Sequence, residues 1–246
     1  MIQHMVTSDP SPAYISRVAA KFNNNGAGVR GDMKAVVAAI LLDPEARGDV
    51  KTDPNFGKLR EPVQLITNLG RTFDVTNAAQ TGQSDGVFWV SSATNGQLTP
   101  LAQVPFYSPT VFNYFPPDYQ IPGTTLLGPE FVLMTTSTAV GRTNFVTTFT
   151  IGNGIAVNGV NVPVGTRLNV TELQALAAAD TTGQQLVDHL NRKMLYGTMS
   201  TQMRTTILTA VTAIAASNPI TAQQALDRAK QALFLVASSS QYQVQR

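Results

Sequence analysis

Residues 82–86 read GQSDG and match the pattern G-x-S-x-G. In α/β-hydrolases the glycines of this pattern allow a strained turn that lifts a nucleophilic serine above a sheet. An acid and then a histidine must follow in chain order, and Asp118 or Glu130 followed by His189 satisfies that order. The pattern therefore supports one hypothesis, an esterase-like serine hydrolase in which Ser84 is the nucleophile.

The surroundings of this motif favour a simpler interpretation, a Gly/Ser turn without catalytic function. A buried strand should precede a nucleophile elbow, whereas FDVTNAAQT precedes this one, and no βαβ alternation surrounds it. A five-residue pattern with two free positions also arises easily by chance. We therefore expect Ser84 to lie beyond hydrogen-bond reach of His189.

Carboxylates in the middle of the chain allow a second chemistry. Asp74, Asp85, Asp118 and Glu130 could supply the acid and base of a carbohydrate-active enzyme, which needs two carboxylates flanking the scissile bond. The sequence does not fix the separation between any two of them. Helix capping and ion pairing are the simpler roles for these side chains.

Metal and cofactor sites are not expected. The chain has no cysteine, which excludes thiolate sites, and only two histidines, His4 and His189, so a histidine metal site is not expected. His189 stands between Asp188 and Asn191 in an amphipathic stretch, which suggests a position near the solvated face of a helix. The stretch GNGIAVNG is not followed by a helix start, so it does not resemble a phosphate-binding loop.

Residues 108–119, SPTVFNYFPPDY, contain four aromatic residues and three prolines. One interpretation is a core plug, in which Phe112 and Phe115 are buried and Asp118 is exposed or caps a helix. The other is a ring-lined groove that binds a ligand through polar groups. The polar groups of such a groove would be Asn113, Tyr114, Asp118 and Tyr119. We favour the plug, because the rings can bury large apolar areas.

The composition fits a folded protein without a nucleic-acid partner. The 246 residues are 43% hydrophobic and 13% charged, which argues against a disordered chain. Basic residues number 17 and acidic residues 15, and no Lys/Arg run exists. No apolar run reaches the roughly 18 residues of a membrane span, and the first residues do not form a signal peptide.

The periodicity predicts a mainly α fold in a single domain over residues 1–246. Ser11 and Asp32 are predicted to cap helices, Gly70 to end a third helix, and Pro129 to begin another. Period-two alternation predicts a β-ribbon that turns at Asn158-Gly159, with strands within 155–164. The predicted parts are N-terminal helices (1–70), an ordered loop region (71–128), a helix (129–145), the β-ribbon (146–170) and C-terminal helices (171–246).

Caps also mark the helices of the C-terminal third. Three pairs match the spacing of a capping box, and Ser200 is predicted to be a plain N-cap. The pairs are Thr171 with Gln174, Thr182 with Gln185, and Thr221 with Gln224. Short loops between the helices predict antiparallel neighbours.

Three stretches resemble the bacterial "domain of unknown function 1800" family. They are DMKAVVAAILLDPEAR with KLREPVQLI, then QVPFYSPTVFNYFPPDY with LLGPEFVLMTTSTAVGRTNF, and finally LVDHLNRKMLYGTMS with RAKQALFLVASSSQYQVQR. The resemblance runs from end to end and corresponds to the C-terminal half of the family's usual length. It implies a helical fold and export to the periplasm or the exterior, and no activity is established for the family.

A missing half would leave apolar faces without their cover. Because the chain begins inside a predicted helix, we expect Met5, Ile15, Val18, Met33 and Val37 to remain on such faces. A contiguous apolar patch marks an interface, so self-association is expected.

The sequence thus favours an exported helical module without catalytic activity that binds a partner protein or a surface polymer. The hydrolase and the carbohydrate-active enzyme remain the alternatives.

Overall fold

A computed structural model describes residues 1–49, 53–77, 101–152, 154, 166–214 and 217–246. The fold is mainly α-helical, as predicted, with two short antiparallel strand pairs. The chain divides into two compact units, which are described separately. Unit 1 comprises residues 1–60, 107–134 and 244–246, and unit 2 comprises residues 61–106 and 135–243. The expected single-domain organisation stays a prediction.

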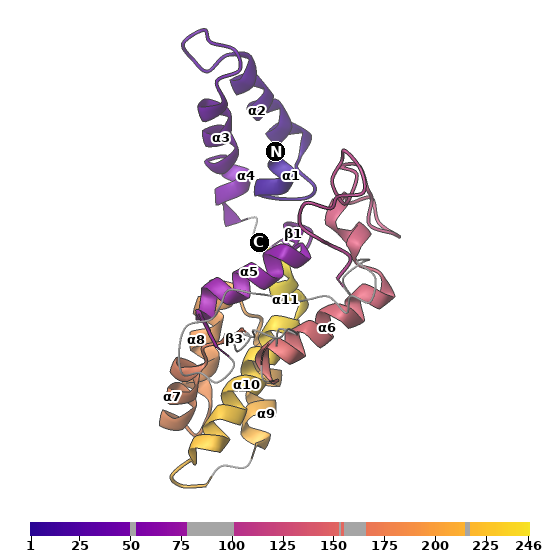
Figure 1. Cartoon of the computed structure of the whole chain (residues 1–246). Coiled ribbons are helices and arrows are strands. Elements are labelled where there is room, and N and C mark those ends of the chain that lie inside the picture. The colour runs from indigo at the N-terminus through magenta and orange to yellow at the C-terminus, as the bar shows by residue number, and fades with distance from the viewer. Residues whose placement is uncertain (50–52, 78–100, 153, 155–165, 215–216) are drawn as a thin grey trace. The chain divides into compact units, whose positions relative to one another are not determined.

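Unit 1 begins with four helices, α1 (Ile2–Met5), α2 (Pro12–Asn23), α3 (Met33–Leu41) and α4 (Pro44–Arg47) (Figure 1). The two predicted caps are confirmed, because Ser11 Oγ accepts the Tyr14 amide and the Asp32 carboxylate accepts the first amides of α3. The hydroxyl of Tyr14, which is fully buried, donates to the carbonyl oxygen of Ile40 at 2.5 Å. This bond joins α2 to α3.

The rest of unit 1 is irregular. Strand β1 (Lys58–Leu59) pairs antiparallel with β4 (Val244–Gln245). The 3₁₀ helix η2 (Pro129–Leu133) comes after residues 108–119, called here the aromatic segment. Few apolar side chains are buried among the described residues of this unit; they are Tyr14, Val36, Ile40, Leu59, Phe115, Pro129 and Leu133.

Unit 2 is a helical assembly built around α10. Its helices are α5 (Pro62–Phe73), α6 (Thr136–Thr150), α7 (Thr171–Ala179), α8 (Gln184–Leu195), α9 (Thr201–Ala213), α10 (Ala222–Ser238) and α11 (Ser240–Gln243). Helix α10 contacts α6, α7, α8, α9 and α11 (Figure 1). Strand β2 (Val75–Thr76) pairs antiparallel with β3 (Arg167–Leu168).

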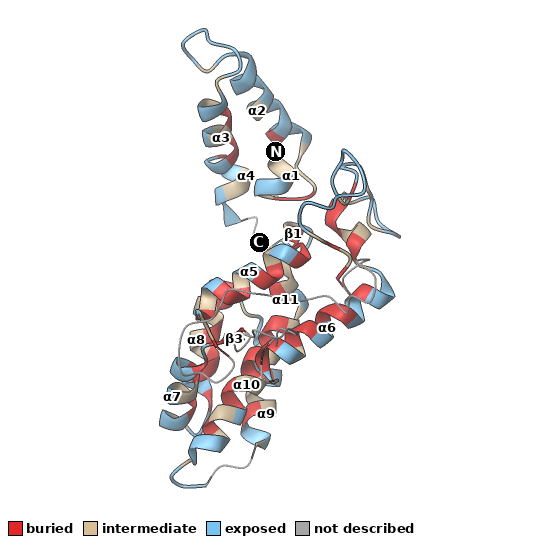
Figure 2. Ribbon diagram, in the orientation of Figure 1, coloured by how far each residue is buried: buried red, intermediate tan, exposed pale blue. Residues whose placement is uncertain are grey.

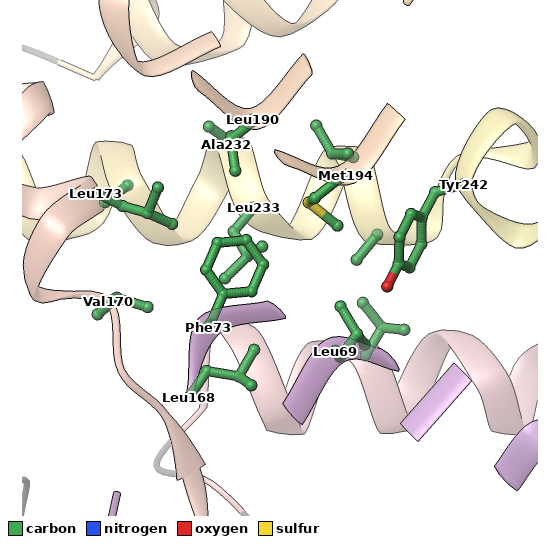
Figure 3. Close-up of a cluster of buried hydrophobic side chains, with 14 of the residues drawn as sticks. Leu69, Phe73, Leu168, Val170, Leu173, Leu190, Met194, Ala232, Leu233 and Tyr242 are labelled. Atoms are coloured by element: carbon green, nitrogen blue, oxygen red, sulfur yellow. The ribbon is translucent and has the colours of Figure 1, made fainter. Parts of the chain in front are cut away.

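One continuous apolar core fills unit 2. Figure 3 shows Leu69 and Phe73 of α5 facing Leu190 and Met194 of α8 and Leu233 of α10. Full burial of such a side chain contributes about 1.5–3 kcal/mol. At one edge of the core, the hydroxyl of Tyr242 donates to Oδ1 of Asn68 at 2.6 Å, so its polar end is satisfied.

The predicted caps of the C-terminal helices are partly right. Ser200 caps α9, and Thr221 with Gln224 forms a complete capping box on α10. The boxes at Thr171 and Thr182 are wrong. Val170 is the N-cap of α7 and Gly183 is the N-cap of α8, and neither makes a side-chain cap.

Asp180 explains the error at the start of α8. Its carboxylate accepts the amides of Thr182 and Gln185 at 2.9 and 3.0 Å. An ionised carboxylate is a stronger acceptor than a threonine hydroxyl, so it displaces the predicted cap.

Two further boundaries differ from prediction. Gly70 lies inside α5 and is buried, and the helix continues to Phe73 because that ring reaches the core. Pro129 opens a 3₁₀ turn, and a separate helix, α6, begins after it at the Thr135–Thr138 capping box.

The N-terminal part of the predicted β-ribbon is also wrong, because α6 extends to Thr150. Phe145, Val146 and Phe149 are buried at helical spacing, so packing overrides the β propensity of VTTFT. The predicted turn at Asn158-Gly159 and its strands lie outside the described residues.

None of the described helices combines the length and the apolar character needed to cross a membrane.

Candidate functional site

Two hollows in unit 1 are lined by described residues. The first, called here the Glu130 pocket, has a volume of about 270 Å³ and is formed by α1, the aromatic segment and η2. It is lined by Gln3, His4, Val111, Phe112, Asn113, Phe115, Pro117, Pro129 and Glu130. No lysine or arginine is among these lining residues.

A tight turn shapes the aromatic wall of the pocket. Thr110 and Asn113 form an isolated β-bridge, and Thr110 Oγ1 accepts the amide of Phe112 at 3.1 Å. Asn113 has a φ of 66°, a left-handed conformation that asparagine tolerates better than most residues. The turn leaves Val111 and Phe112 exposed and directs Phe115 into the interior.

The core-plug interpretation is therefore right for Phe115 and wrong for Phe112. Phe115 is 5% exposed, whereas Phe112 is 63% exposed. Phe112 and Phe115 do not share one side of the turn, because the left-handed conformation of Asn113 between them changes the direction of the chain. Phe112 lines the pocket instead of filling the core.

Gln3 links α1 to the aromatic segment by hydrogen bonds. Its Nε2 atom donates to the carbonyl oxygens of Ser8 at 3.0 Å and Pro117 at 2.8 Å. The amide oxygen of Gln3 is left as an acceptor beside the pocket.

Glu130 is the buried acid of the pocket, with an exposed fraction of 1%. Ser8 Oγ donates to its Oε2 at 2.6 Å. Its Oε1 is buried and has no hydrogen-bond partner, and no other carboxylate among the described residues has such an oxygen. Leaving a buried acceptor unsatisfied costs about 1–3 kcal/mol. A carboxyl oxygen in this state favours any group that can donate to it.

Two basic residues lie near Glu130. His4 is exposed, and its ring centroid lies 6.3 Å from that of Phe115. The ammonium group of Lys58, a buried residue, donates to the carbonyl oxygen of His4 at 2.8 Å. Lys58 is not among the residues that line the pocket.

The structure brings together two of the predicted site residues, Asn113 and Glu130, at this pocket. Asp118 is exposed, Tyr114 and Tyr119 are half-buried, and none of the three lines it. Ser84 lies outside the described residues. The hydrolase and carbohydrate-active interpretations therefore stay hypotheses.

His189, the remaining predicted residue, belongs to unit 2. It is half-buried on α8, and its Nε2 atom lies 3.6 Å from Oε1 of Glu172. Burial lowers the pKa of His189, while the Glu172 carboxylate opposes that shift. Lys193 donates to the other oxygen of Glu172 at 3.0 Å and lowers the pKa of Glu172.

In the part of the chain that the structure describes, no three His, Cys, Asp or Glu side chains gather as metal ligands would.

The second hollow, called here the α2 groove, has a volume of about 430 Å³. It is lined by Met1, Ile2, Gln3, Pro10, Ile15, Val18, Ala19, Phe22, Val36, Ile40 and Leu127, of which only Gln3 is polar. Figure 2 shows how much of α2 and α3 is exposed or only partly buried. As expected, Ile15, Met5 and Met33 are exposed, at 49%, 37% and 46%, whereas Val18 and Val37 are half-buried.

The groove has one basic end. Lys21, Arg30 and Lys34 lie where α2 and α3 are joined by their loop and outnumber the one carboxylate there, Asp32; none of the three basic residues forms an ion pair among the described residues. The guanidinium of Arg30 lies 5.6 Å from the centroid of the Phe22 ring.

The other end of the groove has mixed charge. There Arg17 forms two 2.7 Å hydrogen bonds with the Asp43 carboxylate, and these bonds hold the pKa of Asp43 below its usual range. Glu45 accepts the backbone amide of Ser11 at 2.9 Å.

The partner of Glu130 had no signal in the sequence, because Ser8 lies 122 positions away. Gln3 was equally undetectable, since its two acceptors are backbone carbonyls. The α2 groove could be foreseen, because Ile15, Val18, Ala19 and Phe22 recur at helical spacing.

Comparison with known proteins agrees with the resemblance found in the sequence. No curated protein and no solved structure matches the chain significantly. Residues 1–244 match the family model described as "Protein of unknown function (DUF1800)". Since the match covers nearly the whole chain, the protein belongs to the DUF1800 family.

Proposed function

We propose that this chain is an exported, non-catalytic helical module that binds protein, and that its α2 groove seats the α2 face of a second copy. The observation that carries the proposal is the groove itself, an apolar hollow of about 430 Å³ with a single polar lining residue. Export is proposed on the family resemblance alone.

The exposed stripe of α2 has the pattern of a helix that packs against another helix. Ile15, Val18, Ala19 and Phe22 occupy positions i, i+3, i+4 and i+7, and all of them line the groove. Helix-in-groove recognition uses anchors at this spacing. The same surface can therefore provide both the groove and the helix that fills it.

Charge favours an antiparallel pair. In a two-fold dimer each copy contributes the same patch, so a parallel arrangement would bring the two basic ends together. An antiparallel arrangement places Lys21, Arg30 and Lys34 of one copy against the mixed-charge end of the other. A specific association of this kind should bury at least about 1,000 Å² in total.

Sedimentation velocity across a concentration range tests the proposal. We expect the wild type to dimerise and Ile15→Glu to sediment as a monomer, because the substitution places a charge in the apolar groove. Val140→Glu is the matched control, since Val140 is 56% exposed on α6 and lies outside the groove. Circular dichroism should show equal helix content in all three proteins.

A wild type that remains monomeric at high concentration would overturn the proposal. A dimer weakened equally by Ile15→Glu and Val140→Glu would place the interface elsewhere and overturn it as well.

A further inference from the structure

The Glu130 pocket has a chemistry of its own that the proposed self-association does not use. Its buried acid keeps one oxygen, Oε1, without a hydrogen-bond partner, while Ser8 occupies the other. Oε1 has almost no accessible surface, so a ligand reaches it only when the Glu130 side chain turns toward the pocket that it lines; a ligand group that then donates one hydrogen bond to Oε1 would relieve the cost of the unsatisfied acceptor. The ligand group that binds here must therefore be a hydrogen-bond donor.

The lining favours a cation over an anion. Phe112 and Phe115 contribute aromatic rings, whose faces attract positive charge. Neither lysine nor arginine lines the pocket, and His4 is the only basic side chain that does. An anion entering here would meet a buried carboxyl group and find no lysine or arginine in the lining to pair with.

The acceptors favour a compact cation. A guanidinium binds best to two free oxygens of one carboxylate, but Oε2 already accepts from Ser8. An ammonium group has separate donors that can reach separate acceptors. Oε1 of Glu130 and the amide oxygen of Gln3 are two such acceptors, because the Gln3 nitrogen is engaged with carbonyl groups.

We propose that the Glu130 pocket binds a primary alkylammonium group, with the ammonium at Glu130 and the alkyl chain against Phe112. A pocket of about 270 Å³ suits one short chain of this kind. The ligand is either a free amine or the side chain of a lysine, since both present the same group.

Nuclear magnetic resonance offers a built-in reference for the test. The chain has only two histidines, of which His4 lines the pocket and His189 belongs to unit 2. Titration with n-butylammonium chloride at constant ionic strength should shift the ring resonances of His4 and leave those of His189 in place. n-Butanol, which has the same chain without the charge, should bind at least roughly tenfold more weakly.

Two substitutions test the assigned roles. Glu130→Gln keeps the size of the side chain and removes its charge, and should weaken n-butylammonium binding by roughly tenfold or more. Phe112→Ala alters an exposed ring and should weaken it by roughly two- to tenfold. If Glu130→Gln does not fold, Phe112→Ala still tests the pocket, because its ring is not part of the core.

A second probe, Nα-acetyl-lysine amide, separates the two sources of the ligand. Binding of both probes supports the pocket and admits lysine side chains, whereas binding of n-butylammonium alone supports it as a site for free amines.

Any of three results would overturn the proposal: no shift of His4 at millimolar n-butylammonium, equal binding of n-butanol, or unchanged binding in both variants. Binding of glucose in preference to the amine would make the pocket a sugar site instead.

Discussion

The two units of this protein distribute their apolar side chains in opposite ways. Unit 2 gathers them into one continuous core around α10 (Figure 3). Unit 1 buries few and leaves many large ones exposed, among them Ile15, Phe22, Met33 and Leu42. Both hollows described above lie in unit 1. This difference is the reason for placing the proposed binding surfaces in unit 1 and for expecting the core of unit 2 to provide most of the stability.

The largest expected effect tests this contrast with one substitution in each unit. Phe149→Ala removes a ring that is 2% exposed in the unit 2 core, and should lower the free energy of unfolding by about 3–5 kcal/mol. Phe22→Ala removes a ring that is 41% exposed in unit 1, and should lower it by less than about 1 kcal/mol when measured at a protein concentration at which the chain is monomeric.

Urea denaturation followed by circular dichroism measures both variants. Equal losses would show that the exposed face of α2 is as important for stability as the core of unit 2. That outcome would remove the reason for assigning binding to unit 1.

The second prediction concerns how unit 2 satisfies its buried polar groups. Arg228, which is 2% exposed, donates to the carbonyl oxygen of Ile214 at 2.9 Å and to that of Thr181 at 2.8 Å. Arg228→Met removes the donors and leaves carbonyl groups unsatisfied, so the free energy of unfolding should fall by about 1–3 kcal/mol.

Lys230→Met is the matched control on the same helix. Lys230 also donates to a carbonyl oxygen, that of Ile151 at 2.9 Å, but the bond lies at the surface, where water can replace it. The loss in this variant should stay below about 1 kcal/mol in the same denaturation experiment. A loss equal to that of Arg228→Met would contradict the assigned role of burial.

Local signals predicted the parts of the fold that depend on neighbouring residues. Ser11, Asp32, Ser200 and Thr221 cap their helices because each side chain reaches an amide within the next three positions. The apolar stripe of α2 also depends only on neighbouring residues, and it predicted an apolar face where the α2 groove lies.

Sequence patterns gave wrong predictions where contacts between residues distant in the sequence determine the structure. Gly70 continues α5 because Phe73 packs against other helices, and residues 146–150 are helical because Phe149 does. The sequence indicates Glu130 as a candidate acid but not its hydrogen-bond partner, because Ser8 lies 122 positions away. Nothing in the sequence could pair those two side chains.

The smallest expected effect is a pH dependence that arises in unit 2. Burial lowers the pKa of His189 below the ordinary value of about 6.5. The folded protein then binds fewer protons than the unfolded chain, so the stability is present above pH 6.5 and decreases as the pH falls through the lower, folded-state pKa. Asp43 of unit 1 also has a lowered pKa, but a carboxyl group of this kind changes the free energy of unfolding only below about pH 4. Between pH 7 and 5 the slope should therefore come from unit 2.

Two substitutions around His189 give opposite changes in that slope. His189→Gln removes the titrating group, so the free energy of unfolding should change less between pH 7 and 5 than in the wild type. Glu172→Gln removes the carboxylate that opposes the shift, so the folded-state pKa should fall further and the slope should steepen. Denaturation midpoints measured at intervals across this range distinguish the two. If both variants flatten the slope, the Glu172 carboxylate does not favour the protonated ring, and the 3.6 Å contact contributes nothing to its titration.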